Sequence, residues 1–150
     1  MERTTSDGAS PIEPNPHTES ANPIVGTQME GAVAVLTMQY PPHNLFDLAL
    51  TRAVIDALAW ARGQGARAVV LNSAMRHFSA GADLKAIENG LGEDGGQLLL
   101  ELLGAFREHP APIIASVHGV CVGGGLEIAL ACDFVIAAES SKLGCVEPIV

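Results

Sequence analysis

From Gly31 onward, short apolar runs alternate along the chain with longer segments whose apolar residues recur at helical spacing. The short runs are rich in β-branched residues and bounded by Gly or Pro, which is typical of strands. They cover Gly31–Tyr40, Ala68–Leu71, Pro112–Val117 and Asp133–Ser140. The longer segments are predicted helices, and they cover Leu45–Gly65, Gly96–Pro110 and Leu126–Cys132. Strands that alternate with helices run parallel, so the pattern predicts an α/β fold.

Apolar spacing within two of these helices predicts which side chains face the core. The first helix is expected to end at Gly63. Its predicted buried stripe consists of Leu48, Val54, Ile55 and Leu58. The second helix is expected to end before Pro110, and its predicted stripe consists of Leu99, Leu102, Leu103 and Phe106.

The charge balance restricts the partners of the chain. Its 150 residues include 8 basic and 17 acidic side chains, which give a formal net charge of −9. Nucleic-acid binding requires a basic face, so the composition argues against a nucleic-acid partner. No apolar run is long enough to span a bilayer. We therefore expect a cytoplasmic protein that does not bind membranes.

Residues 1–22 differ in composition from the rest of the chain. They are rich in Ser, Thr, Glu and Pro and contain almost no large apolar side chains. Such a segment buries too little surface to offset the entropy lost on ordering, so we expect a disordered tail. It also lacks the apolar stretch of a secretory signal. Residues 23–150 are left to form the folded domain.

Cys121, Cys132 and Cys145 lie in apolar sequence, without a CxxC pair or the ligand spacing of a zinc site. We expect three buried free thiols in a reducing compartment, and no metal site. His77, His118 and Asp133 adjoin predicted strand ends and small-residue loops. We expect these three to be packed or hydrogen-bonded structural residues.

Three consecutive glycines, Gly123–Gly125, stand where a predicted strand gives way to a helix. A helix N-terminus exposes unpaired N–H groups and a partial positive charge, and glycine lets a ligand approach the backbone closely. The chain lacks the Lys of a P-loop, the spacing of a dinucleotide fingerprint and the GxSxG elbow that accompanies the HGGG motif of lipases. Two interpretations stay open: an anion or oxyanion site, and close packing of the helix against a strand.

A second loop favours the oxyanion interpretation. The segment "HFSAGADLK", His77–Lys85, also follows a predicted strand and passes through small residues towards a helix. Two loops that each offer backbone N–H groups can hold one carbonyl oxygen between them, as in an oxyanion hole.

Several segments, taken in order, resemble signature segments of the enoyl-CoA hydratase/isomerase (crotonase) superfamily. They are "FSAGADLK", "GGGLEIALACDFVIA" and "LGCVEP", together with "PPHNLF" at the position of the family's early Asn-containing turn. The resemblance covers about Thr27–Val150 and implies a crotonase-like spiral of ββα units. It also implies a C-terminal helical trimerisation part that this chain lacks, so that residues 23–150 would be the N-terminal core of an incomplete domain. A full-length form would be a homo-oligomer, either a trimer or a dimer of trimers.

The resemblance also implies roles for individual residues. The backbone N–H groups of Ala82 and Gly124 would hold the thioester oxygen of an acyl-CoA. Glu127 and Glu147 occupy the positions of the two catalytic glutamates of the hydratases. The residues that would line the acyl-CoA site are Asp83, Leu84 and Lys85, with Lys85 near the phosphates.

The chemistry of hydration requires such a pair of acids. Water must be activated at Cβ of the enoyl group while a proton reaches Cα, and two carboxyl groups that face one water can share these tasks. We therefore expect an enoyl-CoA hydratase, a lyase of lipid and fatty acid metabolism, with no cofactor beyond the CoA of its substrate. Three alternatives stay open: an enoyl-CoA isomerase, an acyl-CoA hydrolase, and a truncated non-catalytic subunit of the same fold.

Overall fold

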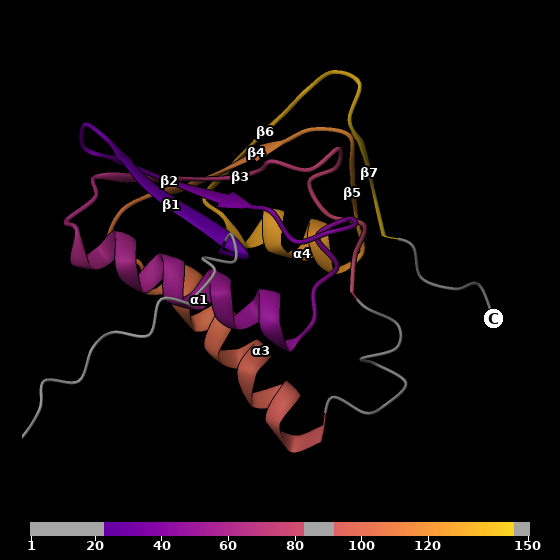
Figure 1. The fold of residues 1–150 in the computed structure, drawn as a ribbon, viewed down its shortest axis with the longest axis horizontal. Helices are drawn as coiled ribbons and strands as arrows, with labels where there is room; N and C mark the ends of the chain where they lie inside the picture. Colours follow the sequence, from indigo (N-terminus) through magenta and orange to yellow (C-terminus); the bar gives the residue numbers. More distant parts are fainter. Residues whose placement is uncertain (1–22, 83–91, 146–150) are drawn as a thin grey trace, which may run out of the picture.

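The computed structural model describes residues 23–82 and 92–145, without the side chains of residues 92–95. The expected disordered tail, residues 1–22, lies outside these ranges. The strands are β1 (Val25–Glu30), β2 (Val33–Met38), β3 (Ala68–Ser73), β4 (Ile113–Val117), β5 (Val120–Val122), β6 (Phe134–Ala137) and β7 (Lys142–Gly144). The helices are α1 (Leu48–Gly63), α3 (Gly92–Arg107) and α4 (Gly124–Ala131) (Figure 1).

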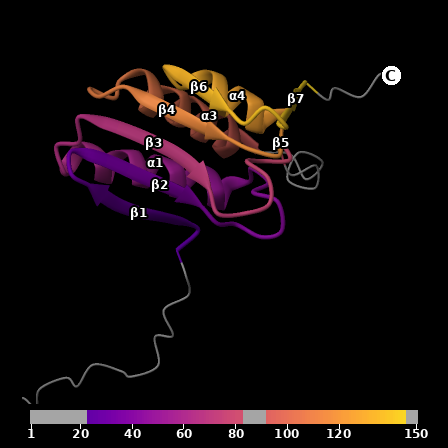
Figure 2. The ribbon, with the colours of Figure 1, turned by 90° about the horizontal axis from the view of Figure 1, so that it is seen from above.

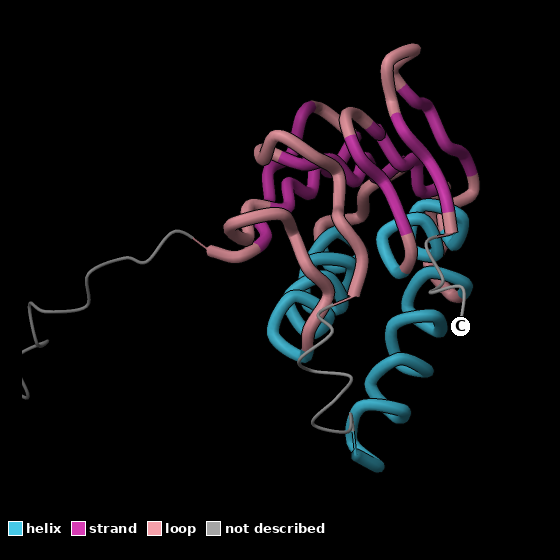
Figure 3. The backbone as a smooth tube through the Cα atoms, turned by 90° about the vertical axis from the view of Figure 1, so that its right-hand side faces the viewer, coloured by secondary structure: helices cyan, strands magenta, loops and turns pink. Residues whose placement is uncertain are grey.

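The main sheet has the strand order β1-β2-β3-β4-β6. Strand β1 pairs with β2 in antiparallel orientation, and every other pair in this sheet is parallel. Figure 2 shows these strands side by side, with the helices beyond them. In Figure 3 the helices all lie beneath the strands, on one face of the sheet. The expected α/β class is therefore confirmed.

A second, smaller sheet crosses the end of the main sheet. Strands β5 and β7 pair in parallel, and two isolated bridges, Ser79–Cys121 and Phe46–Ala82, extend this layer with short loop segments. In Figure 1, β5 and β7 run steeply downwards where the strands of the main sheet end. Three turns of the chain thus each contribute a strand to the main sheet, a short extended segment to the second layer and then a helix, and β6 and β7 follow in the same order, which gives the expected spiral of ββα units.

Helix α1 begins at a side-chain cap. Asp47 is the N-cap residue, and its carboxylate accepts a hydrogen bond from the N–H of Leu50 at 2.8 Å. The hydroxyl of Tyr40 donates to the same carboxylate at 2.7 Å. Capping of this kind satisfies an N–H group that the helix leaves unpaired. The cap therefore fixes where the chain leaves the second layer and enters α1.

The core lies between the main sheet and the helices, and it is mostly aliphatic. Its largest fully buried apolar side chains are Phe78, Leu36, Met38, Leu50, Leu58, Leu71, Leu102 and Ile113. Close packing of such side chains is the main source of stability for a domain of this size.

Both predicted helix stripes need correction. In α1, Leu48 is exposed and Ile55 only half-buried, while the buried stripe consists of Leu50, Val54, Ala57, Leu58 and Ala61. In α3, Leu99 and Leu103 are exposed, and the buried stripe consists of Leu98, Leu102 and Phe106. The cause is the run of leucines in α3, which places apolar side chains around most of the helix, so that spacing alone does not select the packed face.

Strands β1, β5 and β7 were not predicted from the sequence. Strand β1 is an edge strand whose sequence, VGTQME, is largely polar, and β5 and β7 have three residues each. Elements this short carry little periodicity. In the described ranges, no helix is long and apolar enough to cross a membrane.

We predict that Leu102→Ala lowers the free energy of unfolding by about 2–5 kcal/mol, because it leaves a cavity in a packed core. The neighbouring change Leu103→Ala, identical in chemistry and on the same helix, should alter it by less than about 0.5 kcal/mol. Urea unfolding followed by circular dichroism measures both. Equal losses in the two variants would contradict the burial described for α3.

Candidate functional site

The two glycine-containing loops lie side by side in the second layer. The N–H of Ser79 donates to the carbonyl of Val120 at 3.2 Å, and the N–H of Val122 donates to the carbonyl of Ser79 at 3.2 Å. This parallel pairing brings Ala82 next to Gly124: a Cβ built on Gly124 would lie 3.5 Å from the backbone nitrogen of Ala82. The structure therefore brings together the two N–H donors that the sequence suggested.

The direction of the Ala82 N–H is fixed by its own peptide group. The carbonyl of Gly81 accepts a hydrogen bond from the N–H of Phe46 at 2.9 Å. The Gly81–Ala82 peptide is trans, since the cis bond in the described chain is Pro41–Pro42. In a trans peptide the N–H points opposite to the C=O. The Ala82 N–H therefore points away from Phe46, and within the described part of the chain it has no acceptor.

The Gly124 N–H is held in a comparable way. The carbonyl of Gly123 accepts hydrogen bonds from the N–H groups of Leu126 and Glu127, at 2.9 and 3.0 Å. The Gly124 N–H on the same peptide consequently points the opposite way, out of the N-terminal end of α4, where backbone N–H groups lack helical partners. It too has no acceptor among the residues described. Gly123 is in turn tied to β7, because its N–H donates to the carbonyl of Gly144 at 3.0 Å.

Glu127 lies in the first turn of α4, the helix that begins at Gly124, and its side chain is exposed. Its backbone position is fixed by the bond from its N–H to Gly123. A carboxylate in the first turn also interacts favourably with the helix dipole. The other expected site residues, Asp83, Leu84, Lys85 and Glu147, lie outside the described residues.

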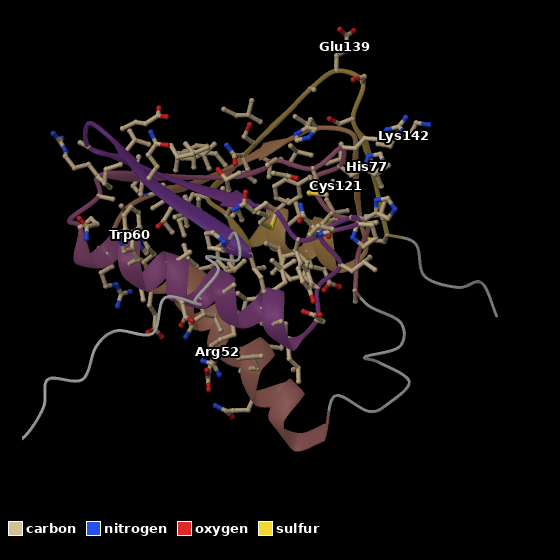
Figure 4. All side chains as sticks on the ribbon, viewed as in Figure 1. Arg52, Trp60, His77, Cys121, Glu139 and Lys142 are labelled. Atoms are coloured by element: carbon tan, nitrogen blue, oxygen red, sulfur yellow. The ribbon has the colours of Figure 1, made fainter. Side chains whose placement is uncertain are left out.

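His77, His118 and Asp133 are structural hydrogen-bonding residues, as expected. His118 Nε2 lies 2.8 Å from the carbonyl oxygen of Met75, and the N–H of Val120 donates to His77 Nδ1 at 3.3 Å. The carboxylate of Asp133 accepts from the N–H of Ile113 at 2.7 Å and joins the start of β6 to β4. Figure 4 places His77 and Cys121 together at the end of the main sheet, far from Trp60 on α1.

The expectation for the cysteines is correct for two residues and wrong for the third. Cys121 and Cys132 are buried, and burial raises the pKa of Cys121 to about 11 and the pKa of Cys132 to about 12. The negative charge of Asp133 contributes further to the raised pKa of Cys132. Cys145 is exposed, because it follows a surface strand, β7, whose Lys142 and Leu143 are exposed as well.

Sequence reasoning missed several residues that support the two loops. Asn44 and Ser79 are buried polar residues, and Phe46 supplies the N–H that orients the Gly81–Ala82 peptide. Asn44 and Phe46 lie in "PPHNLF", which entered only as a family segment, and Ser79 lies in the small-residue loop "HFSAGADLK", where no role was predicted for it. A polar residue within an otherwise apolar or small-residue loop was the signal available for Asn44 and Ser79.

The structure is a spiral of ββα units in which the backbone of Ala82 lies beside that of Gly124 in the second layer, and the comparison with known families assigns this fold to a class. The family model described as "Enoyl-CoA hydratase/isomerase" matches residues 28–149. The chain therefore belongs to the enoyl-CoA hydratase/isomerase family.

Individual relatives agree with this assignment. The chain is 40% identical over 124 residues to a protein of Bacillus subtilis named "Probable enoyl-CoA hydratase", covering 77% of this chain and 46% of the relative. It is 32% identical over 133 residues to a Mycobacterium tuberculosis protein named "(7aS)-7a-methyl-1,5-dioxo-2,3,5,6,7,7a-hexahydro-1H-indene-carboxyl-CoA hydrolase", covering 83% and 53% of the two chains.

A solved structure confirms the fold. The crystal structure of an enoyl-CoA hydratase/carnithine racemase from Magnetospirillum magneticum matches with a TM-score of 0.73 and 29% identity, covering 81% of this chain and 49% of the other. The chain thus spans about half the length of the relatives that it matches.

We predict that iodoacetamide at pH 8 labels Cys145 and leaves Cys121 and Cys132 unmodified in the native protein. The two buried thiols stay protonated at this pH because their raised pKa values lie far above it, and the thiolate is the reactive form. Mass spectrometry of tryptic peptides identifies the labelled residues. In urea all three should react, which serves as the control. Rapid native labelling of Cys121 would contradict the burial of that thiol.

Proposed function

We propose that this protein is an enoyl-CoA hydratase, which adds water across the 2,3 double bond of an enoyl-CoA thioester. The observation that carries the proposal is the proximity of the Ala82 and Gly124 backbone, with two N–H groups that lack acceptors in the described chain. The membership of the family and the hydratase names of its relatives support the same reaction class.

The two N–H groups are the proposed oxyanion hole. They donate hydrogen bonds to the thioester oxygen, on which negative charge develops when water attacks Cβ. Fixed donors of this kind act where charge develops in the transition state and need no reorganisation at that moment. The bonds to the Gly81 and Gly123 carbonyls supply the fixed orientation that this role requires.

Two glutamates are the proposed acid–base pair. Glu127 takes a proton from water as the water oxygen bonds to Cβ, and Glu147 delivers a proton to Cα. The position of Glu127 supports its part, since it lies in the helix turn that begins at Gly124. The role of Glu147 rests on the resemblance of "LGCVEP" to the family segment.

The remaining parts of the proposal also rest on the family resemblance. Asp83, Leu84 and Lys85 line the acyl-CoA site, and the functional form is a cytoplasmic homo-oligomer, a trimer or a dimer of trimers. Two other reactions fit the same oxyanion hole. An isomerase moves the double bond with one carboxyl group, and the relative named as a carboxyl-CoA hydrolase supports an acyl-CoA hydrolase as a second candidate.

We predict that Glu127→Gln and Glu147→Gln each reduce the hydration of crotonyl-CoA by about 10²–10⁴-fold, the usual range for a general acid–base group. Glutamine keeps the shape of the side chain but transfers no proton. The losses should be strongly non-additive, because both carboxyl groups hold one water. Loss of the absorbance of the conjugated thioester measures the rate. Glu139→Gln is the matched control, since Glu139 is an exposed acid on the turn after β6, away from α4 (Figure 4).

The same assay separates the alternatives. An isomerase would shift the double bond of a 3-enoyl-CoA, tolerate Glu127→Gln and show no hydration in the parent protein. A hydrolase would release free CoA thiol without hydration. Either pattern would exclude the hydratase.

We further predict that Gly124→Pro lowers kcat by about 10²–10³-fold, because it removes one N–H donor from the oxyanion hole. Gly124 is the first residue of α4, where proline is well tolerated, so the circular dichroism spectrum should match that of the parent. Turnover near the parent rate in a folded variant would show that Gly124 does not bind the thioester oxygen.

A further inference from the structure

Two polar side chains, Asn44 and Ser79, are fully buried in the described chain. Burying a polar group is costly unless hydrogen bonds satisfy it. Neither side chain takes part in the proposed chemistry, yet both lie beside the loop that carries Ala82. Their hydrogen bonds therefore indicate what they do for that loop.

Asn44 ties the end of β2 to the second layer. Its Oδ1 accepts from the N–H of Tyr40 at 2.8 Å, and its Nδ2 donates to Ser73 Oγ at 2.8 Å and to the carbonyl of Phe78 at 3.0 Å. Its backbone φ is 49°, a left-handed conformation that asparagine tolerates better than most residues. Asn44 therefore has a fixed position, and it bonds to the loop that leads to Ala82.

Ser79 connects Asn44 to the oxyanion loop. Its hydroxyl donates to the carbonyl of Asn44 at 2.7 Å and accepts from the N–H of Gly81 at 3.2 Å. Ser79 also supports the start of α4, because a Cβ on Gly125 would come within 2.5 Å of the Ser79 Cβ. One buried side chain therefore contacts both backbone segments that carry the proposed donors.

Gly81 lies between Ser79 and Ala82 and has a backbone conformation that few other residues adopt. Its φ is +104°, a conformation that is open to glycine and strained for other residues. Its N–H is held by the Ser79 hydroxyl and its carbonyl by the Phe46 N–H. Without the hydroxyl, the restraint on the N–H side is lost and only the Phe46 bond holds the Gly81–Ala82 peptide, so that the Ala82 N–H can tilt from its direction towards the substrate.

We infer that Ser79 is a positioning residue, whose hydroxyl holds the Gly81 N–H and so adds a second restraint, beside the Phe46 bond, on the direction of the Ala82 N–H; this role rests on the proposed oxyanion hole. Serine suits the position on two grounds. Alanine lacks the hydroxyl, and threonine would place an added methyl group beside Ser79's close neighbour Gly125.

The test compares Ser79→Ala with Ser73→Ala. Ser73 is the matched control, because its hydroxyl is part of the same network but bonds to Asn44, His77 and Met75 and does not bond to Gly81. Both variants should lose stability. Only Ser79→Ala should lower kcat, by about 10–10²-fold, with KM within about twofold of the parent, since a small misplacement of a catalytic group costs up to about 10²-fold.

A spectroscopic readout checks the cause directly. In the parent, the carbonyl stretch of a bound acyl-CoA should move to lower frequency, because the two donors polarise the C=O bond. Ser79→Ala should lose part of this shift, and Ser73→Ala should keep it. Ser79→Cys should recover part of the loss, since a thiol is a weak donor and acceptor.

A third measurement requires no substrate. The N–H residual dipolar coupling of Ala82, measured by NMR, reports the direction of that bond. It should change in Ser79→Ala and stay constant in Ser73→Ala; an unchanged coupling in Ser79→Ala would overturn the positioning role. If the parent shows no hydration and no carbonyl shift, the proposed function fails instead. Should Ser79→Ala not fold, the coupling of Ala82 is measured in Ser79→Cys, whose thiol replaces the hydroxyl only in part. A partial change of the coupling is expected there, and an unchanged coupling would overturn the positioning role.

Discussion

Parallel backbone pairing between short segments of the second layer is the constraint on which the rest of the site depends. The Ala80 N–H bonds to His43, the Phe46 N–H to Gly81, and the Ser79 N–H to Val120, so that three successive turns of the spiral lie in register. Once this register is set, the peptides before Ala82 and Gly124 are oriented by their own carbonyl bonds. The proposed electrophilic site is therefore made of main chain. Side chains in these loops act by permitting close approach or by holding the backbone in place.

The main elements of the fold were predictable because their signals are long. Strands β2, β3, β4 and β6 and the helices α1, α3 and α4 of the described chain follow from apolar runs and periodicity. The packed face of α3 did not follow, because only tertiary contact with α1 and α4 selects it. Leucines stand around most of this helix, at positions 98, 99, 100, 102 and 103. Strand β5 was not predicted, because it is a short segment between the turn at His118–Gly119 and Gly123. Its partner, β7, is too distant in the sequence for a local pattern to indicate the pairing.

The candidate site was predictable in its location and less so in its support. Two glycine-containing loops after parallel strands indicated where N–H donors meet, and the family resemblance indicated which residues supply them. The restraints on those donors come from elsewhere in the chain: Phe46 and Asn44 precede the Ala82 loop by a whole helix and strand, and Gly144 follows Gly123 by another turn of the spiral. Hydrogen bonds over such separations leave no spacing signal in the sequence, so the buried state of Asn44 and Ser79 required a structure.

Strand β6 has a consequence for how copies of this chain behave towards one another. It pairs with β4 on one side, and in the described chain its other edge is unpaired, with Phe134 61% and Ile136 66% exposed. An apolar edge of this kind is a template for strand addition by a neighbouring molecule. The net charge of −9 makes copies of the chain repel one another. Salt screens this repulsion, so that it extends only about 8 Å at physiological ionic strength. Strand addition at β6 would thus compete with charge repulsion between copies, and added salt should favour association by screening that repulsion.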